Sequence, residues 1–318
     1  MKTVLIALLL LTGAAQAQLP DPYNPPERQW AKLPDGGPWG SSAGIEMGPH
    51  GELWAIDRCA ANSCDGSTLA AVHQLDPDSG KVLRSIGAGL FAFPHGLHID
   101  KDGNVWVTDP AVSKDGSKGQ QVVKLSPDGK VLMRLGLAGK TGGGATMFSN
   151  PSAVITAPDG SIFVIDGHGT SKPDLPPDTI ARVIHFTKDG RFLKAWGSLG
   201  TGQSQFRDPH ALAFDSQGRL FVADRANGRI QIFSQDGTWL SEYRSFGHTS
   251  GLVITPDDTL YAVGNGADGQ KGIYIGSART GEVSAFVPDD KVGEGIAAGT
   301  DGTLYEATPT GLTRFTRK

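Results

Sequence analysis

The sequence has no surplus of positive charge. It contains 29 lysine and arginine residues against 33 aspartate and glutamate residues, a net charge of −4, and the basic residues are scattered along the chain. Proteins that bind nucleic acids contact the phosphates through clustered lysine and arginine side chains. The composition therefore argues against a nucleic acid as a partner.

Long apolar runs are also missing. The only one, Val4 to Leu11, follows the positively charged Lys2 and precedes Ala15-Gln16-Ala17. It is too short to cross a bilayer, and this order of charge, apolar run and small residues is typical of a cleaved signal peptide. We predict a signal peptide at residues 1–17 and an exported protein, secreted or periplasmic, without a membrane span.

Cysteine is nearly absent. The only two, Cys59 and Cys64, lie five residues apart. In an exported protein such a pair favours a local disulfide. Metal binding by the pair is the alternative, but the sequence has no further cysteine to complete a thiolate site.

The 3.6-residue spacing of an amphipathic helix does not occur after the predicted signal peptide. Instead, 44 glycines separate short apolar runs, which indicates many strands joined by tight turns. Two stretches match closely, Phe93-Pro94-His95-Gly96-Leu97 and Asp208-Pro209-His210-Ala211-Leu212. The strands that follow them end in Asp109 and Asp224.

This pattern recurs six times. In each copy one residue stands eight positions before a turn glycine or its equivalent, and we call these the ring residues. Their spacing ranges from 40 residues, His210 to Ser250, to 58 residues, Ser152 to His210. The six ring residues are Ala43, His95, Ser152, His210, Ser250 and Glu294.

Each copy continues with two more strand-like runs. Four short antiparallel strands per repeat predict an all-β, six-bladed β-propeller over residues 28–318, after a short tail at 18–27. The last copy is one strand short, whereas Arg28–Leu33 has no neighbouring partner. We predict that this N-terminal strand completes the last blade and closes the ring of a monomeric protein.

The ring residues can carry chemistry. The first strand of each propeller blade lines the central channel, so the six side chains are neighbours around one ring. An isolated histidine at a strand start usually has a structural role, but His95, His210 and Glu294 fall in alternate blades. Two imidazoles and a carboxylate form a known zinc ligand set with one open position. The pattern therefore predicts zinc or another divalent metal in the channel.

The chain resembles the peptidyl-α-hydroxyglycine α-amidating lyase family, a branch of the NHL-repeat propellers. The resemblance extends over nearly the whole mature chain. It implies an enzyme that cleaves the C–N bond of a carbinolamide, with zinc held by three channel histidines. The strongest matches are Asp57-Arg58, Pro94–Leu97, Val107–Asp109, Pro209–Leu212 and Ala223–Ile230.

The resemblance also implies roles for individual residues. The zinc ligands match His95 and His210, and the third falls on Glu294. Two arginines that hold the carboxylate and carbonyl oxygens of the substrate match Arg58 and Arg225. A planar guanidinium suits that task because it can donate two parallel hydrogen bonds.

Two positions differ from the family pattern. The catalytic tyrosine of the family is replaced by His168, which can also transfer protons near neutral pH. The structural calcium of the family uses an aspartate where this chain has Gly295. Glycine supplies no carboxylate, so the resemblance does not carry Ca²⁺ over to this chain.

Two further histidines lie near ring residues. His248 is two residues before Ser250 and within reach of the pocket rim, so we count it among the substrate-binding candidates. His98 is three residues after His95, and strand alternation predicts that it points away from the channel and packs. The polar segment 166–180, which contains His168, is expected to be a long loop, either one that shapes the mouth of the pocket or a variable surface loop.

These observations predict an exported metal-dependent lyase with a small-molecule or peptide-derived substrate. One alternative is another metal-dependent propeller enzyme, such as a lactonase-like hydrolase. Gluconolactonase-type propellers bind their metal through Glu, Asn and Asp, which counts against it. The other alternative is a non-catalytic NHL binding propeller, which would need no metal.

Overall fold

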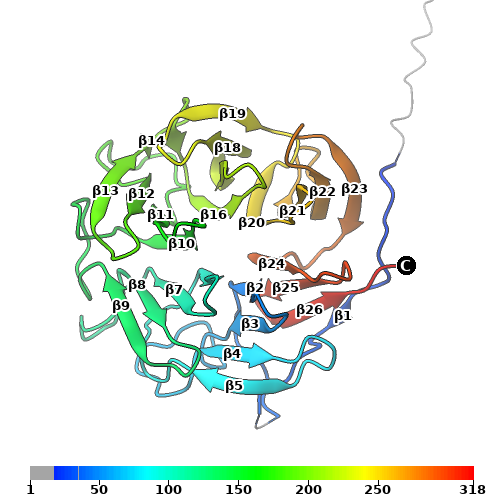
Figure 1. The fold of residues 1–318 in the computed structure, drawn as a ribbon, viewed down its shortest axis with the longest axis horizontal. Coiled ribbons are helices and arrows are strands. Elements are labelled where there is room, and N and C mark those ends of the chain that lie inside the picture. The colour runs from blue at the N-terminus through cyan, green and yellow to red at the C-terminus, as the bar shows by residue number, and fades with distance from the viewer. Residues whose placement is uncertain (1–17, 35) are drawn as a thin grey trace, which may run out of the picture.

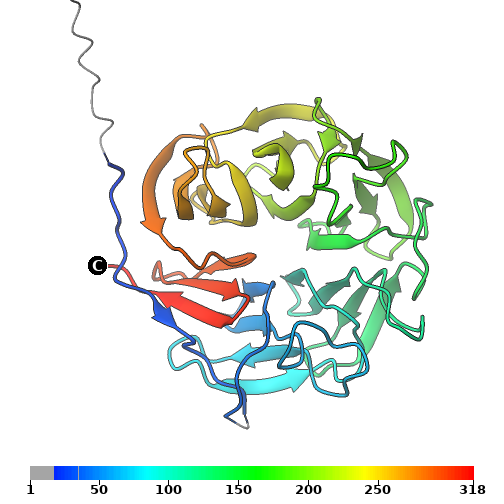
Figure 2. The same cartoon turned by 180° about the vertical axis from the view of Figure 1, so that it is seen from behind.

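The computed structural model describes residues 18–34 and 36–318, so the predicted signal peptide lies outside the described residues. Six four-stranded antiparallel sheets surround a central axis (Figure 1), and the same ring is seen from behind in Figure 2. The predicted all-β, six-bladed propeller is confirmed.

The blades follow one another along the chain, and each runs from the axis outward. The innermost strands are β2 (Ile45–Met47), β6 (Leu97–Ile99), β10 (Pro151–Thr156), β16 (Pro209–Phe214), β20 (His248–Ile254) and β24 (Gly295–Ala298). The second strands are β3 (Leu53–Ile56), β7 (Val105–Asp109), β11 (Ile162–Asp166), β17 (Leu220–Asp224), β21 (Thr259–Asn265) and β25 (Leu304–Thr308). The third strands are β4 (Val72–Leu75), β8 (Gln121–Leu125), β12 (Arg182–Phe186), β18 (Arg229–Phe233), β22 (Lys271–Ser277) and β26 (Gly311–Phe315). The outer strands are β5 (Val82–Ile86), β9 (Val131–Leu135), β13 (Phe192–Trp196), β19 (Trp239–Tyr243), β23 (Val283–Pro288) and β1 (Glu27–Arg28).

Little lies outside these sheets. β14 (Ser198–Leu199) and β15 (Gln205–Phe206) form a small parallel pair before the fourth blade, and η1 (Arg225–Asn227) is a single 3₁₀ turn after β17. No helix in the described part of the chain is long and apolar enough to cross a membrane.

The N-terminal strand closes the ring, as predicted. β1 pairs antiparallel with β26, so the sixth blade contains both early and late parts of the chain (Figure 1). The strand is shorter than the predicted Arg28–Leu33, because Gln29 has a positive φ of 50° that turns the chain. The preceding residues also pack on this blade: Tyr23 is 1% exposed, and its hydroxyl donates to the Gly302 carbonyl at 2.8 Å.

The core is divided among the blades. Within the described residues, six apolar clusters fill the six interfaces between neighbouring blades. Trp54 and Trp106, which lie in the second strands β3 and β7, are each 1% exposed. This packing leaves the axis open as a cavity of about 690 Å³, which the ring residues His95, His210 and Glu294 help to line.

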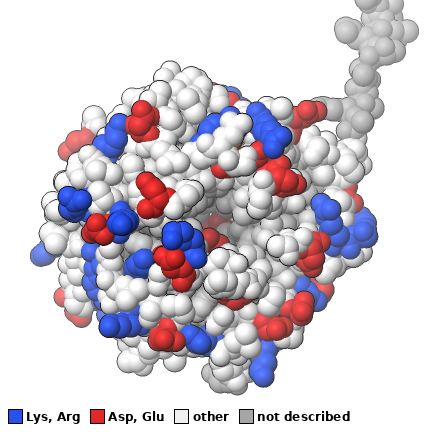
Figure 3. Space-filling model, viewed as in Figure 1, with Lys and Arg blue, Asp and Glu red and all other residues white. Residues whose placement is uncertain are grey.

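Charged side chains of both signs are mixed over the face seen in Figure 3, and the surface is hollowed near the axis.

Candidate metal centre

A repeated acid fixes the loop that enters each innermost strand. In five blades an acid near the end of the second strand accepts a hydrogen bond from a backbone N–H in that loop. In the second blade, both oxygens of Asp109 are used, by the N–H groups of Ala92 and Phe93 at 2.9 and 2.6 Å. Burial raises the pKa of Asp109 to about 6. The five acids are Asp57, Asp109, Asp166, Asp224 and Glu306.

A β-bulge then directs the side chains of the two ring histidines. The pairing of β16 with β17 shifts between Pro209 and Ala211, so His210 is the extra residue of a bulge. His95 has the equivalent arrangement, because its N–H and the carbonyl of Gly96 both bond to Thr108. Bulges commonly redirect side chains next to functional sites.

The bulge also explains a wrong prediction. One extra residue shifts the alternation of the strand, so residues three apart can point to the same side. His98 therefore lines the central cavity, and the prediction that it turns away was wrong.

The two ring histidines are buried and locked in one tautomer. His95 is 2% exposed and donates from Nδ1 to the Ser152 carbonyl at 2.9 Å. His210 is 3% exposed and donates from Nδ1 to the Ser250 carbonyl at 2.7 Å. A carbonyl only accepts, so Nδ1 carries the hydrogen and Nε2 presents a free electron pair. Such orientation of a histidine through its second nitrogen is typical of metal ligands.

Both Nε2 atoms lack a protein partner. Among residues 18–34 and 36–318, no hydrogen-bond partner reaches Nε2 of His95 or His210, although both atoms are buried. Burial lowers the pKa of both imidazoles well below the ordinary value, and nearby cationic groups add to the effect. These histidines are therefore neutral near pH 7, as metal ligands must be.

His168 joins them from the loop after β11. Its ring centroid lies 4.5 Å from that of His95 and 5.3 Å from that of His210. One nitrogen of each ring can be chosen such that all three atoms lie within 4.8 Å of one another. Burial also lowers the pKa of His168. Three neutral imidazoles around one point fit a zinc-type ion with an open coordination position.

The loop of His168 is anchored at several points. The His168 N–H donates to the Asn150 carbonyl at 2.9 Å, and the Gly169 N–H donates to Asp208 Oδ1 at 2.7 Å. Asp208 directly precedes Pro209-His210, so the loop and the fourth blade are tied together at the cluster.

Glu294 faces the cluster from the sixth blade. Its Oε2 lies 3.6 Å from His95 Nε2 and 3.7 Å from Arg58 Nη2, and its Oε1 lies 3.8 Å from Arg225 Nη1. These separations exceed hydrogen-bond lengths, so both guanidinium groups keep donors available to a ligand.

Both arginines are held rigidly. Arg58 is 4% exposed, stacks on Phe93 at 3.8 Å and donates from Nε to the Pro94 carbonyl at 3.1 Å. Burial lowers its pKa. Arg225 donates from Nε and Nη2 to Asp208 at 2.9 and 2.6 Å.

The remaining predicted residues lie around the cluster. Cys59 and Cys64 form the predicted disulfide, and Asn62 within its loop accepts from Arg58 Nη1 at 3.0 Å. His248 is exposed and its Nδ1 bonds to the backbone carbonyl of Arg225 at 2.8 Å, so it contacts the arginine rather than the histidine cluster.

Gly295 is required by packing. A Cβ there would lie 2.4 Å from the Ala43 carbonyl oxygen of the first blade. Any side chain at this position would need the two blades to separate, which explains why no carboxylate stands here.

Sequence reasoning missed three supporting residues, Phe93, Asn62 and Asp208. Phe93 and Asp208 stand two residues before the ring histidines, and this shared spacing was the available signal. Asn62 had no sequence signal beyond its place between the cysteines.

Comparison with known proteins agrees with this architecture. The NHL repeat family matches residues 206–233. The chain is 36% identical over 259 residues to peptidyl-glycine alpha-amidating monooxygenase B of Xenopus laevis, which covers 75% of this chain and 27% of that protein. It is 29% identical over 240 residues to a probable peptidyl-alpha-hydroxyglycine alpha-amidating lyase of Caenorhabditis elegans, covering 71% and 63%.

The chain is similar in sequence to proteins named amidating monooxygenases and amidating lyases. It spans about a quarter of the length of the amidating monooxygenases that it matches. Two solved structures share its fold. A gluconolactonase from Xanthomonas campestris has a TM-score of 0.63 at 17% identity, covering 97% of this chain and 99% of that chain. Virginiamycin B lyase from Staphylococcus aureus has a TM-score of 0.57 at 17% identity, covering 89% and 82%.

Proposed function

We propose that this chain is a metal-dependent lyase that cleaves the C–N bond of a carbinolamide. One observation carries the proposal: two buried histidines with free Nε2 atoms meet a third imidazole, with ligand atoms within 4.8 Å of one another. The sequence similarity to amidating lyases supplies the reaction class.

The three imidazoles of His95, His168 and His210 would hold the metal. Zinc or a similar divalent ion, when bound, supplies Lewis acidity toward an oxygen of the substrate. The sequence alone assigned His168 to proton transfer and Glu294 to the metal. The clustering of the three rings instead favours His168 as the third metal ligand and Glu294 as the group that transfers the proton.

The other residues would bind substrate and move the proton. Arg58 Nη2 and Arg225 Nη1 point toward Glu294 and would bind carboxylate or carbonyl oxygens of the substrate. Glu294 would take the hydroxyl proton of the carbinolamide. The O–H electron pair then forms the C=O bond, the C–N bond breaks, and the leaving nitrogen takes up the proton that Glu294 removed. The products are an aldehyde and an amide.

We also infer that the protein works outside the cytoplasm. The disulfide between Cys59 and Cys64 supports this inference, because such bonds persist mainly in oxidising compartments. The predicted signal peptide points the same way.

Two measurements test the lyase proposal. Metal analysis of purified protein should find about one divalent ion per chain, and His95→Ala with His210→Ala should lose it. His185→Gln is the matched control, because His185 lies in β12 and stacks on Phe163 away from the cluster. Glyoxylate release from an α-hydroxyglycine compound should accompany the metal and stop on chelation. Absence of stoichiometric metal, or turnover of lactones alone, would contradict the proposal.

A further inference from the structure

The central cavity extends beyond the histidine cluster and has apolar walls. Two residues after each ring residue, every blade contributes an aliphatic residue to the cavity lining, and these residues also pack in the clusters between the blades. Each of these residues is buried, with a relative exposure of 4% to 9%. These side chains are Ile45, Leu97, Val154, Leu212, Leu252 and Ile296.

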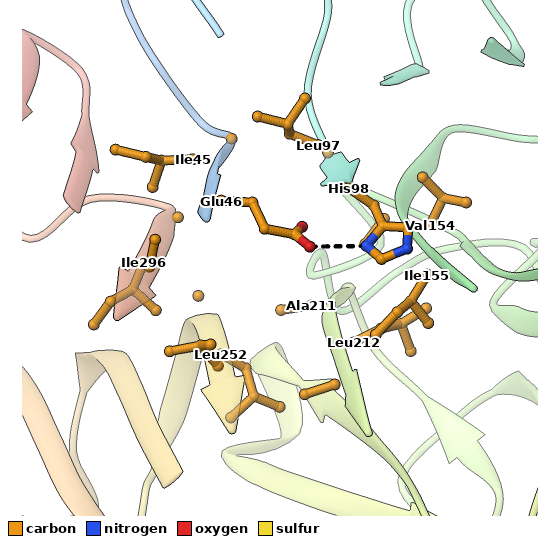
Figure 4. Close-up of a pocket in the computed structure, with 18 of the residues that line it drawn as sticks. Ile45, Glu46, Leu97, His98, Val154, Ile155, Ala211, Leu212, Leu252 and Ile296 are labelled. Carbon is orange, nitrogen blue, oxygen red and sulfur yellow. Dashed lines mark hydrogen bonds and ion pairs between the residues drawn. The ribbon is translucent and has the colours of Figure 1, made fainter. Parts of the chain in front are cut away.

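One carboxylate reaches into this apolar space. Figure 4 shows Glu46 extending across the cavity toward His98, with the aliphatic residues around them. Glu46 Oε1 lies 2.9 Å from His98 Nδ1, and the Glu46 side chain keeps 31% exposure. Apart from histidines, only Glu46, Lys101 and Glu294 among the lining residues are acidic or basic.

The contact partner of Glu46 is an imidazole. The backbone N–H of Thr156 donates to His98 Nε2 at 3.1 Å, and the Thr156 hydroxyl lies 2.8 Å from the same nitrogen. A backbone N–H only donates, so Nε2 accepts, and Nδ1 is the nitrogen that donates to Glu46. Among the residues that the structure describes, no lysine or arginine forms an ion pair with Glu46.

Within residues 18–34 and 36–318, Lys101 is the one lysine or arginine in the cavity lining, and it is otherwise engaged. Its ammonium is 65% exposed at the side chain and pairs with Asp102 at 3.1 Å. The Glu46 carboxylate therefore stands beside aliphatic residues without a lysine or arginine partner. Its 31% exposure leaves it accessible to a cation that enters the channel.

We propose that this end of the channel is a second binding site, for an organic ammonium ion with an aliphatic body. The aliphatic walls would enclose the body, and the Glu46 carboxylate would attract the cationic head. The whole cavity has a volume of about 690 Å³, within the range of small-molecule sites, and its lining also includes His95, His210 and Glu294. Glu46 and the aliphatic residues are not among those proposed to hold the metal or move the proton, so binding beside Glu46 can be tested separately from the lyase activity.

The test compares two probes with the same six-carbon chain by calorimetry on the metal-loaded protein: hexyltrimethylammonium and hexanol. The quaternary probe cannot coordinate a metal, so any binding reports on the channel. We expect the ammonium to bind at least about tenfold more tightly than hexanol. This order needs no variant, so it remains decisive if a channel variant fails to fold.

Variants then locate the site. Glu46→Gln preserves shape, removes the charge and should weaken ammonium binding about tenfold while leaving hexanol unchanged. Glu282→Gln removes the same charge from an exposed position and should change nothing. Equal binding of hexanol and the ammonium, ammonium binding insensitive to Glu46→Gln, or binding of inorganic cations alone would overturn the proposal. Loss of lyase activity in His95→Ala should leave ammonium binding intact, which separates the two sites.

Discussion

At the scale of single residues, the functional state of each ring histidine is set by the next blade. The carbonyls of Ser152 and Ser250 hold the Nδ1 hydrogens of His95 and His210. The sequence identified both histidines, but these backbone partners could not be read from it. Every residue has a backbone carbonyl, so the residue type does not show which carbonyl accepts from a histidine. Only the arrangement of the blades shows which carbonyl lies next to each imidazole.

His168 and Glu294 can be assigned by separating metal content from turnover. We expect His168→Gln to release metal, because it removes one of three clustered imidazoles. Glu294→Gln should keep the metal and lower turnover about 10²- to 10⁴-fold, the usual range for a lost general base. Zinc competition titration and glyoxylate release provide the two readouts. If instead Glu294→Gln releases the metal and His168→Gln keeps it but lowers turnover, then Glu294 is the metal ligand and His168 transfers the proton, as predicted from the sequence alone.

At the scale of elements, the sequence pattern predicted the repeat but not the irregularities within its strands. The strand-ending acids and turn glycines recur at fixed spacing, so the six blades followed from pattern alone. The bulges at the ring residues add one residue to a strand without changing the motif. The alternation rule therefore failed at His98. The path of the loop that carries His168 is likewise set by its contacts with Asn150 and Asp208.

The closing strand provides a stability test. Arg28 donates to both oxygens of Asp289 at 2.8 and 2.6 Å, and the Asp289 side chain is fully buried. Arg28→Ala leaves that carboxylate unpaired and should lower the free energy of unfolding by about 2 kcal/mol. Arg84→Ala removes an exposed pair with Asp128 and should cost less than about 1 kcal/mol. If urea unfolding shows equal losses of unfolding free energy for Arg28→Ala and Arg84→Ala, the Arg28–Asp289 pair does not stabilise the attachment of β1.

At the scale of the whole molecule, buried histidines make stability depend on pH. Burial lowers the pKa of His73 to about 4. Between the unfolded value of about 6.5 and that value, the unfolded chain binds a proton that the folded chain does not. Each such histidine therefore lowers stability as the pH falls. Asp109 and Asp166, with pKa values raised to about 6, act in the opposite direction as the pH falls from 6 toward 4.

A variant isolates the histidine contribution. Between pH 6.5 and 4, the free energy of unfolding of the parent protein should fall more steeply with falling pH than that of His73→Phe, both without metal. The difference in slope should be up to about 1.4 kcal/mol per pH unit. Urea unfolding at several pH values measures the difference. His50→Phe, at an exposed position, is the control and should leave the curve unchanged. Parallel curves for His73→Phe and the parent would contradict the assignment of a buried neutral imidazole.

The pairing of β1 with β26 also sets an order of events. Glu27 and Arg314 are direct partners although 287 residues separate them. Contacts so distant in sequence form late in folding, because a long loop must close first. Translation proceeds from the N-terminus, so the first strand must wait for the last one to be made. Glu294 belongs to the blade that this pairing completes, so the acidic side of the histidine cluster is finished only when the two ends of the chain meet.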